Sequence, residues 1–509
     1  MTVEAEKSAR QHLADELAAA RAGGDPAKLG TKLPVRERLA LLLDDGSLRE
    51  DGLLASSLDE RLRADGVITG TGAIDGRRVA VIAHDPSVKA GSWGRRTVEK
   101  QIRILELADR DLLPVMFLVD SAGGRLTDAL GFHPGHRGAA RIFHLQVRLS
   151  GRVPQVCCLF GPSAAGGAYM PAFCDWVGMV EGNASMALAS PRIAEKAIGE
   201  IVTLEEMGGA KMHCTVSGCG DQLFSDDAEA IAGARAFLSY LPAHYDVRPE
   251  RTAPVPPAAA DWDGVLPENL RTPYDVLTVI ERIVDGGSFF EIKKRWAREM
   301  VIGFARIDGR AVGIVANQPK MRGGSINVDS ADKAARFISL CDAFNLPLIF
   351  LADLPGFMIG SAVERAGIIR HGAKMIAAMA STDVPRFCVV LRKAFAAGYY
   401  AMSCPGFEPR ATIALAGAKI GAMDGAAAVN AVWANKIAEI DDEDERTAFI
   451  DERRAKLDDE LDSMRLASEL MVEAVVDPDD LRGELAGRLD AADGWARRAQ
   501  SRHHGTFPV

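Results

Sequence analysis

Two glycine-rich segments are the part of this sequence best suited to chemistry. They are GPSAAGGA at residues 161–168 and GAKIGAMDGAAA at residues 417–428, and each occupies a place where a strand should give way to a helix. Backbone N–H groups at the start of a helix lack an intrahelical acceptor, and small residues let a ligand approach them closely. A pair of such donors can stabilise an enolate oxygen by about 3–4 kcal/mol per donor. The two loops therefore indicate chemistry that proceeds through oxyanions.

Several other chemistries lack the residues they need. Neither loop matches the phosphate-binding pattern GxxxxGK[ST] or the dinucleotide pattern GxGxxG, so we do not expect the chain to use ATP itself. No GxSxG elbow occurs, and Ser163 has no histidine nearby in the sequence to act as its base, which disfavours an acyl-enzyme. The eight cysteines are scattered without zinc-site spacing. We expect no metal, and reduced thiols in the core.

An internal duplication organises the elements that must position these loops. Asp120 ends the segment LPVMFLVD, and Asp353 ends LPLIFLAD 233 residues later (353 − 120). Both segments predict buried parallel strands that end in a tight glycine turn. Pro154 and Pro385 begin a second matched pair, in which we expect a strand, a small-residue loop and a helix. Each half also opens with a segment predicted as a glycine-capped helix followed by an edge strand, at residues 38–50 and 280–292.

The Pro- and Ala-rich stretch at residues 247–266 predicts a linker between the two halves. We therefore expect two α/β domains, one over residues 1–250 and the other over residues 251–509. The acidic stretch at residues 441–462 predicts a solvated helix with charge pairs four residues apart.

Composition restricts the partners. Among 509 residues, 60 Lys and Arg face 70 Asp and Glu, and the formal net charge of −10 disfavours a nucleic-acid surface. The N-terminal segment mixes both signs of charge, and no run approaches the eighteen apolar residues of a membrane span. We expect a cytoplasmic protein that binds neither nucleic acid nor membrane.

Three longer segments resemble a known family. They are VTLEEMGGAKMHCTVSG within residues 181–218, the segment from ANQPKMRGG to LPGFMIG at residues 316–360, and GIIRHGAKM at residues 367–375. Over almost the whole chain the sequence is similar to the β (carboxyltransferase) subunits of propionyl-CoA, methylcrotonyl-CoA and acetyl-CoA carboxylases. The resemblance implies two tandem crotonase-like (ClpP/crotonase) domains. It also implies a biotin-dependent transfer of CO2 from carboxybiotin to the α-carbon of an acyl-CoA.

The family places an acyl-CoA site in the N-terminal domain and a biotin site in the C-terminal domain. By position, the resemblance assigns the donors to the thioester enolate to Ala165, Gly166 and Gly167. It assigns those to the biotin ureido oxygen to Asp424 and Gly425. Small residues beside the biotin pocket fall on Ala396, Ala397 and Gly398. For the coenzyme A phosphates, the basic candidates are Lys89, Arg95 and Arg96.

The chain departs from the family at two places. Asp424 stands where glycine is common, and a carboxylate beside a developing oxyanion would oppose it unless it were turned away or neutralised. Leu415 and Ala416 replace a Trp-Pro pair, so the preferred acyl group cannot be transferred from the family. His213 and His371 match family positions, but we assign neither a catalytic role.

The resemblance also implies partners. The sequence shows no AMKM-type biotin attachment site and no ATP-binding domain. Carboxybiotin should therefore arrive on a biotin carboxylase or biotin carboxyl carrier subunit, and the carboxyltransferase core should be a homo-hexamer.

Three alternatives remain. A biotin-dependent decarboxylase subunit would run the same transfer in reverse. An inactive assembly subunit would keep the fold without activity, and Asp424 is the residue that suggests this alternative. A crotonase-type hydratase or isomerase would need carboxylates at the enolate site, and the first loop offers none.

Overall fold

The computed structural model describes residues 8–125, 127–128, 135–495 and 504–507, apart from the side chains of Glu60 and Ala426. The N-terminal stretch examined for a leader lies outside this range over residues 1–7. By its contacts the chain forms two units. Unit 1 contains the described residues up to Arg248 together with residues 504–507, and unit 2 contains those from Pro249 to residue 495.

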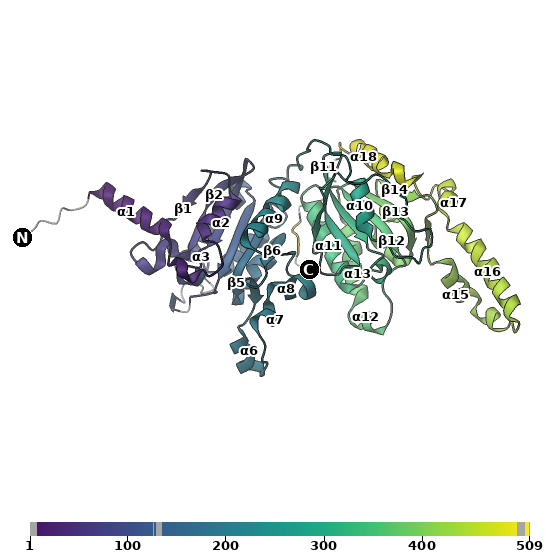
Figure 1. Cartoon of the computed structure of the whole chain (residues 1–509), viewed down its shortest axis with the longest axis horizontal. Helices are drawn as coiled ribbons and strands as arrows, with labels where there is room; N and C mark the ends of the chain where they lie inside the picture. The colour runs from purple at the N-terminus through teal and green to yellow at the C-terminus, as the bar shows by residue number, and fades with distance from the viewer. Residues whose placement is uncertain (1–7, 126, 129–134, 496–503, 508–509) are drawn as a thin grey trace, which may run out of the picture. The chain divides into compact units, whose positions relative to one another are not determined.

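Unit 1 is built on one mixed sheet in the order β1-β2-β3-β4-β5-β6-β8, with β7 beside the end of β5 (Figure 1). The first three strands are antiparallel, and the strands from β3 onward run parallel. The strands are β1 Arg49–Asp51, β2 Val67–Ile74, β3 Arg77–His84, β4 Val115–Ser121, β5 Gln155–Ala164, β6 Trp176–Val180, β7 Ser185–Ala187 and β8 Gln222–Phe224. The α-helices are α1 Ala9–Ala22, α2 Val35–Leu42, α3 Arg95–Asp111, α4 Ala140–Leu149, α5 Tyr169–Ala172, α6 Pro191–Ile198, α7 Leu204–Gly208, α8 Ala210–Met212 and α9 Asp227–Tyr240.

Unit 2 repeats this architecture, with its sheet in the order β9-β10-β11-β12-β13-β14-β16 and β15 beside the end of β13. The strands are β9 Phe290–Ile292, β10 Met300–Ile307, β11 Arg310–Asn317, β12 Leu348–Leu354, β13 Arg386–Phe395, β14 Ala411–Leu415, β15 Lys419–Gly421 and β16 Ala474–Val476. The α-helices are α10 Val276–Ile283, α11 Val328–Ala343, α12 Ser361–Arg365, α13 Ile368–Ala380, α14 Ala396–Ala401, α15 Gly425–Ala438, α16 Glu443–Glu460, α17 Ser463–Ser468 and α18 Leu481–Ala491.

The internal duplication is confirmed strand by strand. Each strand of the first sheet has a counterpart at the same place in the second, and the register shifts in both sheets where β4 meets β5 and where β12 meets β13. Strands β4 and β12 are buried along their whole length, as their apolar runs predicted. The carboxyl ends of β4 and β5, and of β12 and β13, thus form equivalent edges in the two units.

One expectation about connecting segments is wrong in detail. The C-caps of helices α2 and α10 are Leu43 and Val284, which are extended and buried, so glycine does not cap these helices. Gly46 and Gly287 instead take positive φ in the turn that follows, because the chain must reverse there to reach the edge strand. The Pro-rich stretch at residues 247–266 has no helix or strand, and the N–H of Thr252 donates to the carbonyl oxygen of Gly309 within unit 2.

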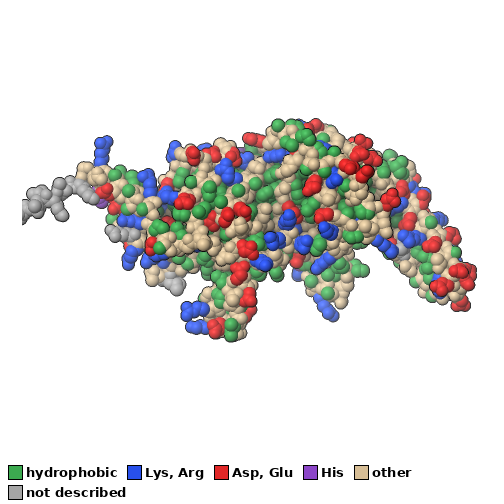
Figure 2. Space-filling view, in the orientation of Figure 1, with side chains coloured by type: hydrophobic (Ala, Val, Ile, Leu, Met, Phe, Trp, Pro, Cys, Tyr) green, Lys and Arg blue, Asp and Glu red, His purple; other side chains and the backbone are tan. Residues whose placement is uncertain are grey.

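The acidic segment forms helix α16, which has no buried residue, and Arg454 pairs with Asp458 four residues on. This expectation is confirmed. Figure 2 shows acidic side chains gathered along this helix.

A buried aspartate stands at the end of the central strand of each sheet. Asp120 receives the guanidinium of Arg38 at 3.2 Å and the ammonium of Lys32 at 2.9 Å. Its counterpart, Asp353, receives Arg392 at 2.7 Å, and the backbone N–H of Asp353 donates to Asn317. Burial raises the pKa of Asp353, and a buried carboxylate of this kind depends on its cation.

The two cations come from different elements. Arg392 lies on β13, and the equivalent position on β5 is Gly161. A Cβ at Gly161 would lie 1.9 Å from a carboxylate oxygen of Asp120, so no side chain fits there. Unit 1 therefore takes its arginine from helix α2 instead.

We predict that Arg392→Met lowers the free energy of unfolding of unit 2 by about 3–5 kcal/mol, because it leaves the carboxylate of Asp353 buried without its cation. Urea unfolding followed by circular dichroism measures this. The double variant with Asp353→Asn should recover part of the loss, and Arg465→Met, which removes an exposed pair with Asp459, should not move the midpoint. An equal loss for the single and double variants would contradict the role of the ion pair.

Candidate active site

The first glycine-rich loop forms a tight helical turn, Ala165–Ala168, at the end of β5. Ala165 adopts φ 54°, a left-handed conformation that alanine rarely takes. Ala165 and Gly166 are exposed, and a Cβ at Gly166 would meet nothing within 4 Å. The first N–H groups of a helical turn have no intrahelical acceptor. Exposed donors of this kind are what oxyanion binding requires.

The equivalent turn in unit 2 opens helix α14 at the end of β13. Ala396 lies 231 residues after Ala165 and has the same φ of 54°. Ala396 and Ala397 are exposed, as Ala165 and Gly166 are, whereas Gly398 is buried. A Cβ at Gly398 would lie 2.7 Å from the Cα of Gly356, so only glycine allows this approach. Unit 2 therefore presents its own pair of exposed backbone donors at Ala396 and Ala397.

A second turn lies beside each of these donor pairs, and the sequence analysis missed its part in the site. Gly123 follows β4 with φ 92°, and a Cβ on it would lie 3.3 Å from the carbonyl oxygen of Ala164. Gly356 follows β12 with φ 139°, and its Cβ would lie 3.7 Å from the Cβ of Ala396. From their residue types, the strings DSAGG and DLPGF predict only tight turns. The signal that could have assigned both turns to the site is their equivalent position, three residues after Asp120 and Asp353.

Trp93 contacts both turns of unit 1, the one at Gly123 and the one that begins at Ala165. Its backbone exchanges hydrogen bonds with Gly123 and Arg125, and its ring lies 4.0 Å from where a Cβ of Gly167 would be. The indole N–H donates to Nε2 of His84 at 3.0 Å, and the two rings stack. Complete burial lowers the pKa of His84 to about 4, so the imidazole is neutral at pH 7 and can accept this bond.

Ser163 does not act as a nucleophile in this arrangement. Its hydroxyl donates to the carbonyl oxygen of Gly167 at 2.9 Å, which closes the turn upon itself. The two histidines make structural hydrogen bonds: His213 contacts the carbonyl of Met186 at 2.8 Å, and His371 contacts the carboxylate of Asp332 at 2.8 Å.

The second glycine-rich loop leads from β15 into helix α15. Asp424 is the N-cap of this helix, and its carboxylate accepts the N–H of Ala427 at 3.0 Å. Gly425 is buried, and a Cβ there would lie 2.3 Å from a carboxylate oxygen of Asp458. The exposed carboxylate of Asp424 is therefore engaged by its own helix.

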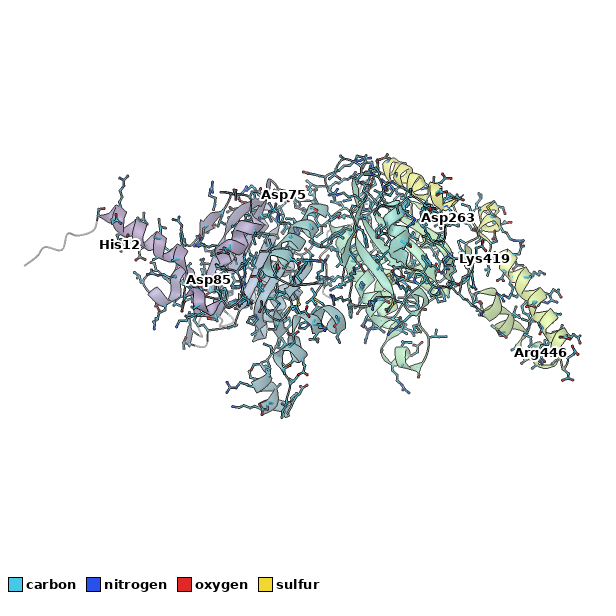
Figure 3. The ribbon with its side chains drawn as sticks, in the orientation of Figure 1. His12, Asp75, Asp85, Asp263, Lys419 and Arg446 are labelled. Carbon is cyan, nitrogen blue, oxygen red and sulfur yellow. The ribbon has the colours of Figure 1, made fainter. Side chains whose placement is uncertain are left out.

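Asp424 and the end of β13 share one pocket. The pocket measures about 460 Å³ and is lined by both Asp424 and Phe395, the residue that precedes Ala396. Lys393 and Lys419, which is labelled in Figure 3, also line it. Of the two groups of residues singled out separately in the sequence, 424–425 therefore line this pocket, whereas 396–398 follow Phe395 and are not part of its lining.

The three basic candidates for phosphate binding lie on one stretch of unit 1. Lys89, Arg95 and Arg96 are all exposed. Lys89 opens a turn of three residues with positive φ, 89–91, and the two arginines begin helix α3. The matching positions of helix α11 hold Val328 and Asp329. This stretch of unit 1 carries positive charge that its counterpart in unit 2 lacks at the helix start.

Seven of the eight cysteines are buried and all are free, as expected, and Cys219 is exposed. Within the described residues, no group of three or more His, Cys, Asp or Glu side chains could hold a metal ion. In the same part of the chain, no helix combines the length and apolarity that crossing a membrane requires.

Residues 29–507 match the family described as the carboxyl transferase domain, and the chain belongs to this family. The chain is 55% identical to the uncharacterized carboxylase YngE of Bacillus subtilis (strain 168) over 94% of each sequence. It is 35% identical to the propionyl-CoA carboxylase carboxyltransferase subunit of Haloferax mediterranei, again over 94% of each. The crystal structure of transcarboxylase 12S with methylmalonyl-CoA and methylmalonic acid bound matches it with a TM-score of 0.92, 34% identity and complete coverage of both chains.

These matches confirm the family resemblance and the crotonase-like fold of the two units. They also establish the activity class: the protein is a biotin-dependent acyl-CoA carboxyltransferase. Its substrates are CoA thioesters, and biotin is the carrier of the carboxyl group.

We predict that the protein loses stability as the pH falls from 6.5 towards 4, because the lowered pKa of His84 makes its protonation costly in the folded state. The stabilising contribution of neutral His84 is fully present above pH 6.5, and the loss of stability reaches about 3 kcal/mol at pH 4 and below. Urea unfolding at pH 7, 5.5 and 4.5 measures this. The variant His84→Asn, which copies Asn317 of unit 2, should have a shallower slope. A slope equal to that of the parent protein would exclude His84 as its source.

Proposed function

We propose that unit 1 binds the acyl-CoA and that the turn beginning at Ala165 holds the thioester enolate. The exposed N–H groups of Ala165 and Gly166, with Gly167 adjacent, are the donors. Their positions are set before any substrate binds, because β5 and Trp93 hold the turn from two sides. The observation that carries this proposal is the strained, exposed turn that recurs in both units.

The coenzyme A phosphates bind in this proposal near Lys89, Arg95 and Arg96. The support is the exposure of all three side chains and the lack of a matching basic helix start in unit 2. The start of helix α3 itself is occupied, because the N–H of Arg95 donates to the carboxylate of Asp128 at 2.7 Å, so the side chains carry this part of the proposal. This difference supports the proposal that the acyl-CoA binds to residues 1–250 and biotin to residues 251–509.

We propose that unit 2 holds the biotin ureido oxygen through the N–H groups of Ala396 and Ala397. The duplication supports this pair over Asp424 and Gly425, because Ala396 and Ala397 correspond in φ, exposure and strand position to Ala165 and Gly166. Asp424 and Gly425 line a pocket that reaches Phe395, the residue before this pair. The assignment of the second donor pair to Asp424 and Gly425 stays a prediction that the variants below can test.

The pocket that Phe395 lines suits a ring of mixed polarity, since this apolar residue shares it with Lys393, Lys419 and Asp424. Carboxybiotin, when bound, supplies the carboxyl group and, once that group has left, a basic ureido nitrogen that can take the α-proton. The chain's own part is to hold two oxygens that become negative: the thioester oxygen at Ala165 and Gly166, and the ureido oxygen at Ala396 and Ala397. No side-chain base is required.

Asp424 does not support the inactive alternative. Its carboxylate accepts a hydrogen bond from its own helix, and Lys393 and Lys419 line the same pocket. The negative charge that would oppose an oxyanion is therefore turned away and partly balanced. We propose an active enzyme working in the direction of carboxylation, as the names of its carboxylase relatives suggest.

We predict that Gly166→Val and Ala397→Val each lower kcat by about 100-fold, because a branched side chain denies the ligand oxygen its approach to the donors. The assay is decarboxylation of malonyl-CoA or methylmalonyl-CoA by the purified chain with free biotin, which needs neither ATP nor a partner. Asp424→Gly should remain within a few-fold of the parent, and Gly487→Ala on α18 serves as a folding control. Loss of activity in Asp424→Gly with retention in Ala397→Val would move the second donor pair to residues 424–425.

We also propose that the core is a homo-hexamer that receives carboxybiotin from a separate biotin carboxylase or biotin carboxyl carrier subunit. The transcarboxylase 12S structure is described as a hexamer assembly. Four apolar side chains around helix α6, which projects from its sheet in Figure 1, are 57–88% exposed: Leu188, Ile193, Ile198 and Ile201. Such a patch needs a partner surface. Eight free cysteines suit a cytoplasmic location, which cell fractionation would test.

Light scattering should give a mass of about six times 54.5 kDa for the parent chain. We predict that Ile198→Asp reduces this mass, because a charge within the exposed apolar patch cannot be buried against a partner at low cost. Lys196→Ala on the same helix is the matched control. A parent chain that runs as a monomer would refute the hexamer.

A further inference from the structure

A buried carboxylate away from the donor turns receives the end of the chain. Asp175, 3% exposed, accepts the hydroxyl of Thr506 at 2.6 Å. The N–H of Thr506 donates to Oγ of Ser150 at 2.9 Å, and that hydroxyl donates back to the carbonyl of Thr506 at 3.1 Å. Thr506 is itself 7% exposed. Residues far apart in the sequence thus form a specific, buried contact within unit 1.

The surface that receives the tail is shaped for backbone contact. Gly151 has φ 67°, and a Cβ there would lie 2.1 Å from the carbonyl oxygen of His504. A Cβ at Gly505 would lie 3.1 Å from Oγ of Ser150. One glycine on each side therefore permits the two segments to approach more closely than side chains would allow. We call the surface formed by residues 150, 151 and 175 the tail notch.

Hydrogen bonds lead from the tail notch to the helix that follows the first donor turn. Asp175 accepts the N–H of Gln155 at 2.8 Å and donates its own N–H to Gln155 at 2.7 Å. The side-chain amide of Gln155 donates to the backbone carbonyl of Gln146 at 2.9 Å. The side-chain amide of Gln146 donates in turn to the backbone carbonyl of Met170 at 3.0 Å. Met170 lies in α5, which continues from the turn Ala165–Ala168.

We propose that the tail notch is a peptide-docking site, that its ligand is the Gly-Thr segment of the chain's own C-terminal tail, and that its occupancy holds the first donor turn in its productive geometry. Docking supplies a hydroxyl to the carboxylate of Asp175 and excludes water from the base of β5 and β6. When the tail leaves, Asp175, where the hydrogen-bonded path to α5 begins, loses the hydroxyl of Thr506. Asp175, Gln155 and Gln146 are positioning residues in this proposal. Its catalytic part rests on the function proposed for Ala165 and Gly166.

The test uses the chain ending at residue 502 and a synthetic peptide of residues 503–509. Removing the tail should lower the melting temperature by about 3 °C and kcat by about tenfold, with KM for the acyl-CoA within twofold of the parent. The peptide should bind saturably in calorimetry and restore both quantities. A peptide carrying valine in place of Thr506 is the matched control and should restore neither.

Should the shortened chain fail to fold, the full-length variants Thr506→Val and Thr506→Ser give the same comparison, and only the serine variant should keep the parent kcat. A shortened chain with an unchanged melting temperature, or one that binds no peptide, would refute the docking site. Peptide binding without recovery of kcat would refute its coupling to the donor turn. Melting and binding need no catalysis, so an inactive parent chain would count against the proposed function and leave the docking site to be judged by itself.

Discussion

The structure depends on a negative charge that each sheet buries at the end of its central strand. Asp120 and Asp353 stand where β4 and β12 give way to the glycine turns of the site. A carboxylate in that position is stable only beside a cation, and both units supply one in contact with it. Its backbone matters as well, because Gly91 and Gly324 approach the carbonyl oxygens of Asp120 and Asp353 within distances that no side chain would permit. The aspartate thereby joins the end of β4 to the turn at Gly91, and the end of β12 to the turn at Gly324 and to Asn317 at the end of β11.

The two units solve this common problem differently, and the difference matters for the site. Unit 1 brings Arg38 from a helix, whereas unit 2 places Arg392 on the strand that leads directly into Ala396. The donor turns are nevertheless alike, each with an alanine at φ 54°. An alanine in that conformation costs about 1 kcal/mol and persists because the surrounding strands leave the turn no alternative. The site is therefore built from backbone geometry, while charge distinguishes one unit from the other.

Much of the fold could be predicted from the sequence, because the chain repeats itself. The apolar strands that end at Asp120 and Asp353 match one another, and so do the loops that follow Pro154 and Pro385. The internal offset even contained the answer for the second donor pair, because it aligns Ala396 with Ala165. The equivalence is clear from the positive backbone φ that the two alanines share. The sequence does not reveal it, because alanine, unlike glycine, rarely adopts a positive φ. The support from His84 and Trp93 was equally hidden, because a stacked histidine and indole leave no spacing pattern. Aspartate is a common N-cap, so the role of Asp424 agrees with general capping rules. The direction of its carboxylate could not be predicted, because it depends on where helix α15 begins.

The tail contact also has a consequence for how the protein is made. Asp175 and Thr506 are separated by 331 residues, so the ribosome needs roughly 15–65 s to deliver the second after the first. Throughout that interval the nascent unit 1 holds a carboxylate whose hydroxyl partner has not yet been synthesised. Completion of unit 1 therefore waits on residues 504–507, which follow unit 2 along the chain. A chain that stops early carries an unfinished surface by which cellular quality control could recognise it.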